Sequence, residues 1–529
     1  MSGTVVAEGG MVVAPHRAAA ATGAEVLRAG GNALEAMVAA AATIAVVYPH
    51  MNGLGGDAFF LFAEPGRPPH VIDACGAAGA LATIERYTGR GYDTVPARGH
   101  DAVLTVAGAV AGWGLASEIA ASLGGRLPRR DLLADAIRHA KEGFAVTASQ
   151  ARMTSQNREE LQAVTGFAEH FLVDGKPPEP GVRLIQERLA DTLDHLAQAG
   201  FDDFYRGDVG AAAAADLAAA GSPVTGADLA RHEARLTEPL ALRLDDATLL
   251  NTPAPTQGVA SLIILGLFDR LGVKRGEGFD HVHGLIEATK RAFAVRDAEV
   301  TDPVDSGDLA RFLDPGWLDA EVGRIDRKRA AAWPLDGAGG DTVWMGAVDR
   351  TGLAVSFIQS LYWEFGSGVV LPRTGILWQN RGAAFSLDPR SPRALAPGRK
   401  PFHTLNPAMA RFDDGRVMVY GSMGGDGQPQ FQAAVFTRHA RFGMDLGEAI
   451  AAPRWRLGRA WGASGTGLTV EGRLDPDVVA ALTRAGHRVT VLPEAQADGM
   501  GHAGAVVRRA DSRLTGASDP RSDGAAVAV

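Results

Sequence analysis

The chain of 529 residues contains a single cysteine, Cys75. One cysteine excludes an intrachain disulfide framework and a metal site built from several thiolates. A chain without disulfides fits a reducing compartment, so we expect a cytoplasmic protein. Hydrophobic residues make up 46% of the sequence and charged residues 21%. This composition is typical of a globular protein with enough apolar side chains for a large core.

The sequence also lacks a basic block, a secretion signal and a long apolar run. Its net charge of -9 is spread along the chain, which disfavours nucleic acid and anionic membranes as partners. The first residues, MSGTVVAEGGMVVAPH, contain no basic segment followed by an apolar one, so we expect no signal peptide. The most apolar helical segment, residues 36–47, is short and dominated by alanine. We expect it to be a buried helix and not a membrane span.

Helical patterns dominate the first part of the chain. Residues 16–30 read as a helix that ends at a glycine pair, and Asn32 can cap the next helix, residues 33–47. Further helices are predicted at residues 129–144 and 279–300, and a strand within residues 51–62. Residues 323–341 are charged and then rich in glycine, which is typical of an exposed connector.

Strand patterns dominate after this connector. Residues 341–349 and 353–361 flank the turn DRTG and form a predicted hairpin. Other predicted strands lie within residues 375–380, 410–423, 467–473, 487–493 and 502–510, with a helix at 430–444. The two patterns together predict a layered protein in which helices cover two sheets.

A threonine at the start of the predicted hairpin has a special chemical option. Thr342 follows Gly339-Gly340-Asp341, a flexible lead into a strand. Cleavage of the bond before Thr342 would free its α-amino group beside its own hydroxyl, and this amine can act as the general base for the hydroxyl. The alternative is an ordinary strand-initial threonine, because threonine is common in strands.

Ordered segments along almost the whole chain resemble the γ-glutamyltranspeptidase family. They are GGNALEAMVAAAATIAVVYP, GLGGDAF, TPAPTQGVASL, HGLIEATKRAFAVRD, FGSGVVLPRTGIL, GRKPFHTLNPAM, GSMGGDGQPQ, APRW and GASDPRSDGAA. The resemblance implies an α+β N-terminal-nucleophile hydrolase, an αββα four-layer sandwich made as a proenzyme that cuts itself. Thr342 would be the nucleophile and Asp341–Thr342 the cleavage site. Residues 1–341 and 342–529 would be the large and small subunits of one structural unit, and α2β2 assemblies are common in such enzymes.

The same resemblance implies roles for three more residues. Gly424 and Gly425 occupy the family's oxyanion-hole segment, and a glycine pair lets backbone N–H groups point at one developing negative charge. The alternative is a glycine-rich turn after a strand. No Lys-Ser/Thr follows, which disfavours a phosphate-binding loop, and we expect no cofactor. Ser360 stands where the family has a threonine hydroxyl that contacts the nucleophile, or it is simply a polar residue at a strand end.

The chain departs from the transpeptidases at the residues that hold a glutamate. The family's carboxylate-binding arginine is absent from DACGAAG, residues 73–79, where Cys75 or Gly76 stands in its place. Ala384 replaces the aspartate that binds the α-amino group. His403-Thr404 replaces a pair of serines, and Tyr362 replaces an asparagine. Loss of both charged partners disfavours a γ-glutamyl substrate.

The site instead gains Arg381 and His403, and we expect His502, from GMGHAG, to lie nearby. A guanidinium near the nucleophile suits a small carboxylate held by two parallel hydrogen bonds. These features resemble the branch of the family that hydrolyses oxamate in purine (allantoin) breakdown, an amide that has a carboxylate and no amino group. We therefore expect Arg381, His403, Thr404, Tyr362 and His502 to bind the substrate. A structural ion pair is the alternative for Arg381.

Three other functions compete with this interpretation. The chain could be an acylase on a larger amide, such as a glutaryl or γ-glutamyl compound. It could be an inactive relative kept as a binding protein. It could be a metal-dependent amidohydrolase, because His281 and His283 have the H-x-H form. On a helix these two side chains point roughly 200° apart, so they cannot share one ion and we expect no metal site.

Overall fold

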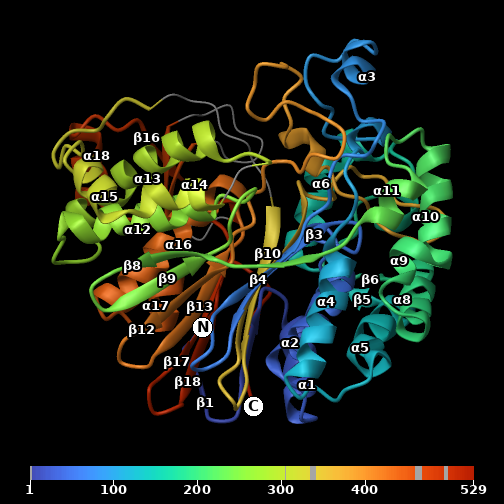
Figure 1. Cartoon of the computed structure of the whole chain (residues 1–529), viewed down its shortest axis with the longest axis horizontal. Coiled ribbons are helices and arrows are strands. Elements are labelled where there is room, and N and C mark those ends of the chain that lie inside the picture. Colours follow the sequence, from blue (N-terminus) through green and yellow to red (C-terminus); the bar gives the residue numbers. More distant parts are fainter. Residues whose placement is uncertain (1–2, 304–305, 334–340, 459–466, 494–497) are drawn as a thin grey trace.

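Two central β-sheets lie between two layers of helices in the computed structural model (Figure 1). The structure describes residues 3–303, 306–333, 341–458, 467–493 and 498–529. The predicted glycine lead Gly339-Gly340 lies outside the described residues, as does part of the predicted connector. Among the described helices, none is both long and apolar enough to cross a membrane.

Each central sheet has seven strands, and neighbouring strands run antiparallel. Sheet A has the order β1 (Val5–Ala7), β18 (Leu514–Ser518), β17 (Ala503–Arg508), β13 (Val417–Ser422), β12 (Ala408–Phe412), β9 (Ala247–Asn251), β8 (Leu240–Arg243). Sheet B has the order β19 (Ala525–Ala528), β2 (Met11–Ala14), β10 (Asp341–Val348), β11 (Ala354–Tyr362), β3 (Asp57–Ala63), β4 (His70–Ala74), β7 (Arg235–Thr237). Both sheets contain strands from before Thr342 and strands from after it.

Helices cover the outer face of each sheet. Those on sheet B are α1 (Arg17–Arg28), α2 (Ala33–Val47) and α4 (Ala109–Ser122), backed by α5 (Arg129–Glu142) and α8 (Glu187–Ala199). Those on sheet A are α12 (Gly258–Leu271), α16 (Gln428–Phe436) and α17 (Leu446–Ala451), with α13 (Phe279–Glu299) packed on α12. The inner faces of the sheets meet in an apolar core that includes Trp344, Ile358 and Val506. This arrangement confirms the predicted αββα sandwich.

Smaller elements connect these layers. The short sheets contain β5 (Phe144–Ala145), β6 (Arg183–Leu184), β14 (Trp455–Leu457), β15 (Leu468–Glu471) and β16 (Val489–Leu492). The remaining α-helices are α3 (Ile84–Thr88), α6 (Ala148–Leu161), α7 (Phe167–Phe171), α9 (Asp203–Arg206), α10 (Asp208–Ala219), α11 (Gly226–Arg231), α14 (Ser306–Ala310), α15 (Pro315–Val322) and α18 (Pro476–Arg484).

Local sequence signals explain most of the predicted elements. Asn32 caps α2 in a reciprocal arrangement with Glu35, in which each side chain accepts a hydrogen bond from the other residue's backbone N–H. The predicted strand at residues 375–380 is wrong. Trp378 N–H donates to Val369 and Gln379 N–H donates to Gly55, so the segment forms only isolated bridges. Its backbone groups pair with several different segments, which prevents a continuous ladder.

Candidate active site

Thr342 lies at the start of β10, buried beside Ser360 of β11. The pairing between the two strands shifts here, since Asp341 lies opposite Tyr362 whereas Val343 lies opposite Gln359. Such a bulge redirects a side chain at the end of a ladder. The Thr342 hydroxyl donates to the Ser360 hydroxyl oxygen at 3.2 Å, and Ser360 Oγ accepts from the Tyr362 N–H at 2.8 Å. The structure thus brings the predicted nucleophile and Ser360 into contact.

Gln428 is a second neighbour of the nucleophile. Its side-chain Nε2 lies 3.5 Å from Thr342 Oγ1, and the residue is fully buried at the first position of α16. Sequence analysis did not select Gln428, although the residue belongs to the motif GSMGGDGQPQ. Its position after the glycine pair was the available signal.

The glycine pair adopts a backbone conformation that requires glycine. Gly424 has φ +119° and Gly425 φ +53°, between β13 and α16. A Cβ atom on Gly424 would lie 2.8 Å from the Phe431 ring. Among the described residues, neither glycine N–H donates a hydrogen bond to another group. This leaves both donors able to stabilise an oxyanion.

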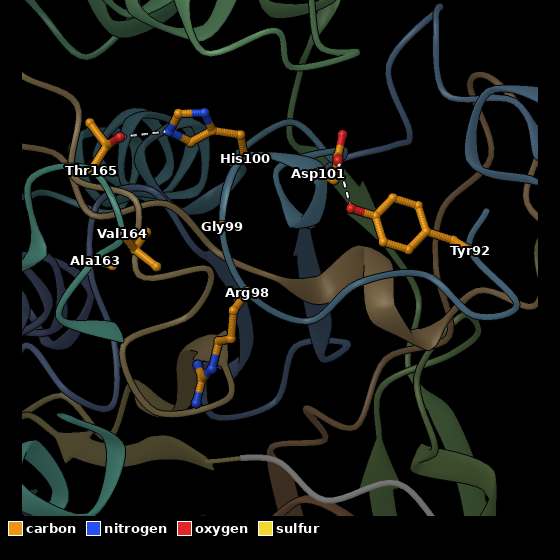
Figure 2. A pocket seen from close by; sticks show the side chains of 8 residues that line it. All are labelled: Tyr92, Arg98, Gly99, His100, Asp101, Ala163, Val164 and Thr165. Atoms are coloured by element: carbon orange, nitrogen blue, oxygen red, sulfur yellow. Dashed lines mark hydrogen bonds between the residues drawn. The ribbon is translucent and has the colours of Figure 1, made fainter. Parts of the chain in front are cut away.

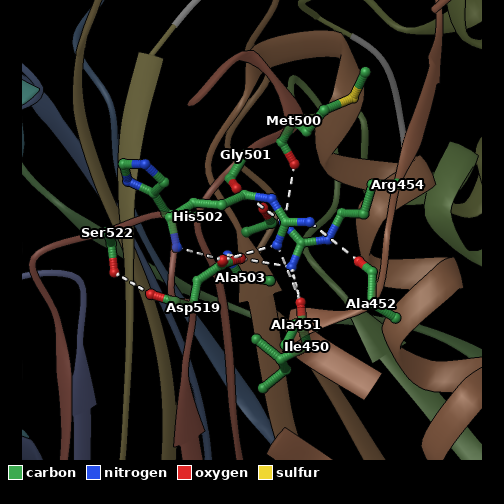
Figure 3. Close-up of polar contacts among 12 residues, drawn as sticks. Ile450, Ala451, Ala452, Arg454, Met500, Gly501, His502, Ala503, Asp519 and Ser522 are labelled. Atoms are coloured by element: carbon green, nitrogen blue, oxygen red, sulfur yellow. Dashed lines mark hydrogen bonds and ion pairs between the residues drawn. The ribbon is translucent and has the colours of Figure 1, made fainter. Parts of the chain in front are cut away.

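A buried ion pair holds the turn that packs against this loop, and Figure 3 shows its two members, Arg454 and Asp519. Arg454 pairs with Asp519 at 2.5 Å and donates to the carbonyls of Met500 and Gly501, both at 2.9 Å. The next residue in this turn, His502, accepts the Met423 N–H through its backbone carbonyl at 3.2 Å. The ion pair therefore fixes the turn against which the glycine loop rests.

The His502 imidazole points away from the Arg454 guanidinium in Figure 3. The ring Nε2 lies 3.7 Å from Asp498 Oδ1. The backbone of His502 thus lies beside the oxyanion loop.

Arg381 is a buried cation without a carboxylate partner among the described residues. Its Nη2 donates to Thr404 Oγ1 at 3.0 Å, its Nη1 donates weakly to Phe402 at 3.4 Å, and its Nε has no partner. The guanidinium stacks on the Tyr362 ring, with Cζ 3.7 Å from the centroid. Burial lowers the pKa of Arg381 from 12.5 to about 10. The structural ion pair considered for this residue is not found.

The residues near Arg381 agree with the differences from the transpeptidases that the sequence shows. Cys75 is buried and close enough to influence the Arg381 charge, while the neighbouring Gly76 N–H donates to Asp57. Ala384 packs against the apolar core of the sheet A side. The positions that hold glutamate in the transpeptidases therefore carry no charged side chain here.

His403 contacts a buried carboxylate that sequence analysis missed. Its Nε2 lies 3.0 Å from Asp57 Oδ2, and Asp57 is paired across sheet B with Ser360. Burial raises the pKa of Asp57 to about 7, against the lowering effect of hydrogen bonds from Gly76, Gln379 and Gly108 and of the Arg381 charge. Burial also lowers the pKa of His403 well below its usual range. A neutral His403 can donate to Asp57 while its Nδ1 accepts from Leu405 N–H at 3.5 Å.

Gln257 connects the glycine loop with the Arg381 group. Its Nε2 donates to the carbonyl oxygens of Thr404 and Gly425, both at 2.8 Å, and its Oε1 accepts from Arg296 at 3.2 Å. Arg296 also forms an ion pair with Asp426 at 3.1 Å. One buried amide thus fixes the spacing between two parts of the site.

A surface pocket of about 350 Å³ borders the turn after β11 (Figure 2). Two hydrogen bonds cross its wall, between His100 and Thr165 at 2.8 Å and between Tyr92 and Asp101 at 3.0 Å. Arg98, which also lines the pocket, donates to backbone carbonyls of the turn that follows Tyr362. The pocket wall therefore helps to hold the strand end that carries the Arg381 stacking partner.

The two histidines of the H-x-H motif contact different partners, as the helix geometry predicts. His281 contacts Thr437 at 2.9 Å, whereas His283 contacts His487 at 2.9 Å. His283, Glu287 and His487 have ligand-type atoms within 4.8 Å of one another. Lys290 lies 2.6 Å from Glu287 and already supplies a positive charge to this group. We therefore interpret the group as a structural network.

Comparisons with known proteins agree with this geometry. The family model for γ-glutamyltranspeptidase matches residues 19–529. The oxamate amidohydrolase proenzyme of Klebsiella pneumoniae is 55% identical over 99% of both chains, and the glutathione hydrolase-like YwrD proenzyme of Bacillus subtilis is 39% identical over 100% of both. The crystal structure of cephalosporin acylase from Bacillus halodurans matches with a TM-score of 0.90 and 32% identity, covering 100% of this chain and 97% of the other. The chain therefore belongs to the γ-glutamyltranspeptidase family.

Proposed function

We propose that the chain is a self-processing amidohydrolase that converts oxamate to oxalate and ammonia. The observation that carries this proposal is the buried guanidinium of Arg381, which stacks on Tyr362 and has no carboxylate in ion-pair contact among the described residues. The 55% identity to a protein named oxamate amidohydrolase proenzyme supports the same substrate.

Processing would hydrolyse the peptide bond between Asp341 and Thr342 and consume one water. The products are residues 1–341 and residues 342–529, which remain together because both contribute strands to both sheets. Relatives named as proenzymes support this step. The new α-amine of Thr342 then lies on the same residue as the nucleophilic hydroxyl.

The reaction follows from the groups around that hydroxyl. The α-amine takes the hydroxyl proton while Thr342 Oγ1 attacks the amide carbon, and the N–H groups of Gly424 and Gly425 stabilise the oxyanion. The carbon–nitrogen bond then breaks, and the nitrogen takes the proton from the α-ammonium and leaves as ammonia. Water attacks the resulting oxalyl ester, releases oxalate and a proton, and restores Thr342. Ser360 orients the hydroxyl throughout through its 3.2 Å contact.

The substrate carboxylate binds to Arg381. A guanidinium has five N–H donors, and the contacts of Arg381 with the described residues use one Nη1 and one Nη2 hydrogen. Thr404 holds one edge of the guanidinium and Tyr362 supports its face. His403 acts through Asp57, which bears on the Arg381 charge, and His502 acts through its backbone contact with the oxyanion loop.

Ammonia release from a panel of small amides tests the proposal. We expect oxamate to be preferred over malonamate, succinamate and glutaramate, and we expect no turnover of γ-glutamyl-p-nitroanilide. A Thr342→Ala protein gives the background rate. Preference for a glutaryl anilide would instead assign an acylase on larger amides. No turnover of any amide would favour a binding protein.

A further inference from the structure

The Gln428 side chain has an unused hydrogen-bond acceptor beside the nucleophile. Its Nε2 lies 3.5 Å from Thr342 Oγ1, whereas its Oε1 has no partner among the described residues. The residue is 0% exposed. Buried side-chain oxygens are nearly always hydrogen-bonded, so an unpartnered one next to a reactive hydroxyl needs an explanation.

Two other buried glutamines on α16 use their side-chain oxygens as acceptors, so the unpartnered acceptor is specific to Gln428 among the three. The Gln430 amide donates to the Leu457 carbonyl at 3.0 Å and accepts the Leu457 N–H at 2.8 Å. The Gln432 amide donates to the Asn406 carbonyl at 2.7 Å and accepts the Ser261 hydroxyl at 3.0 Å. Both of these glutamines use donor and acceptor within the fold. Of the three glutamines, only Gln428, which lies beside the nucleophile, has a side-chain oxygen without a partner among the described residues.

The position of Gln428 in the chain places it at the reacting bond. It is the first residue of α16 and follows directly on the loop that contains Gly424 and Gly425. The carbonyl oxygen of a bound amide would point to that loop during attack by Thr342. The amide nitrogen is the remaining substituent of the attacked carbon, apart from the group that carries the carboxylate.

We infer that Gln428 Oε1 accepts a hydrogen bond from the NH₂ group of a primary amide, which selects substrates that release ammonia. This inference rests on the proposed function and adds the leaving group to it. In the tetrahedral intermediate the bond holds one N–H, which turns the nitrogen lone pair toward the α-ammonium of Thr342. The nitrogen takes that proton as the carbon–nitrogen bond breaks, and ammonia leaves with its electron pair.

Two substrates that form the same acyl-enzyme provide the test. Oxamate and monomethyl oxalate share the carboxylate and the oxalyl group, but methoxide has no N–H to donate. Because kcat/KM reports steps up to acylation, the ratio of kcat/KM for oxamate to that for the ester isolates the leaving group. We expect Gln428→Met to lower this ratio at least about tenfold, since a buried hydrogen-bond acceptor is lost. Gln428→Glu keeps an acceptor and should retain more of the ratio than Gln428→Met.

Rates are taken per cleaved chain, so that slow processing does not enter the ratio. Gln432→Met removes a buried glutamine from the same helix and should lower stability with the ratio unchanged. An equal loss on both substrates in Gln428→Met would overturn the inference, because the residue would then act only on Thr342. An unchanged ratio would overturn it as well. A wild-type protein that releases no ammonia from oxamate would refute the proposed function instead, which separates the two failures.

Discussion

Replacement of Arg381 by methionine separates a functional cation from a structural one. Arg381→Met removes the charge and keeps a long side chain against Tyr362. If the guanidinium binds the substrate carboxylate, the loss of a desolvated charge pair weakens the transition state by about 2–4 kcal/mol. That corresponds to about a 30- to 1,000-fold fall in kcat/KM for oxamate. Self-cleavage should continue, because the hydrogen bonds of Arg381 to described residues go to Phe402 and Thr404 and not to Thr342.

The stability of the same variant should change little. Burial lowers the pKa of Arg381 from 12.5 to about 10, so the charge disfavours folding by about 3 kcal/mol, and methionine removes this penalty. The variant also loses the 3.0 Å bond to Thr404 and the stacking on Tyr362, together about 2–4 kcal/mol. These terms nearly cancel, so we expect the free energy of unfolding to change by less than about 2 kcal/mol.

Arg393 offers a matched control for this experiment. It also stacks on an aromatic ring, Phe402 at 3.8 Å, but it donates to the carbonyls of Arg296 at 3.0 Å and Val300 at 3.3 Å. Arg393→Met should therefore lower stability and leave the KM for oxamate within about threefold. Ammonia release and urea denaturation at one pH measure both effects. A fall in kcat/KM below threefold in Arg381→Met, or a loss of stability as large as that of the control, would refute the assigned role.

Three further predictions concern other parts of the site. Thr342→Ala should give a single uncut chain that releases no ammonia. The small fragment of the wild-type protein should begin at Thr342 on N-terminal sequencing. Ammonia release by the alanine variant would contradict the assignment of Thr342 as the nucleophile. Burial raises the pKa of Asp57 from 3.8 to about 7. The contribution of its protonation to the free energy of unfolding is therefore complete below pH 4. This contribution, about 4 kcal/mol, is lost as the pH rises through 7. Asp57→Asn should remove this part of the pH dependence of the free energy of unfolding. Urea denaturation at pH 4, 5.5 and 7.5 measures it, and an unaltered pH dependence in the variant would contradict the assignment. Gln257→Leu should lower kcat/KM about 10- to 100-fold, because the two 2.8 Å bonds that Gln257 donates to the carbonyls of Thr404 and Gly425 are lost. Unchanged kinetics with lower stability would make Gln257 a purely structural residue.

The parts of the site that depend on local sequence could be predicted. Thr342, the β10–β11 hairpin and the glycine pair each follow from a short pattern, because strand pairing and positive φ angles are properties of neighbouring residues. The cap at Asn32 has the same local origin. The layers of the fold followed from the change of pattern along the chain together with the family resemblance.

The residues that were missed act across long separations in the sequence. Asp57 and His403 are 346 residues apart, and Gln257 and Gly425 are 168 apart. Asp57 stands in a glycine-rich motif that reads as a turn, and its contact with His403 joins the start of β3 in sheet B to the segment before β12 in sheet A. No periodicity or spacing rule connects such positions, because sheet order determines which strand ends meet.

The backbone contact of His502 has the same origin. A histidine in a glycine-rich segment predicts a side-chain ligand, and the structure shows in addition that its backbone carbonyl accepts the Met423 N–H. The backbone role depends on the buried pair of Arg454 and Asp519, which lie in two motifs far apart in the chain. Side-chain chemistry could be read from the sequence, whereas the use of a carbonyl oxygen required the fold.

The charge balance of the site explains why Arg381 remains in a buried place that disfavours it. An arginine kept for stability would be expected to have a carboxylate within ion-pair distance, as Arg454 has in Asp519. Arg381 has a hydroxyl, a distant carbonyl and an aromatic face as neighbours, and Asp57 and Asp426 are acidic groups that bear on its charge. In the proposed function, a carboxylate that enters with the substrate completes this pairing. On that proposal, the destabilised cation is the cost of a site that binds a small anion.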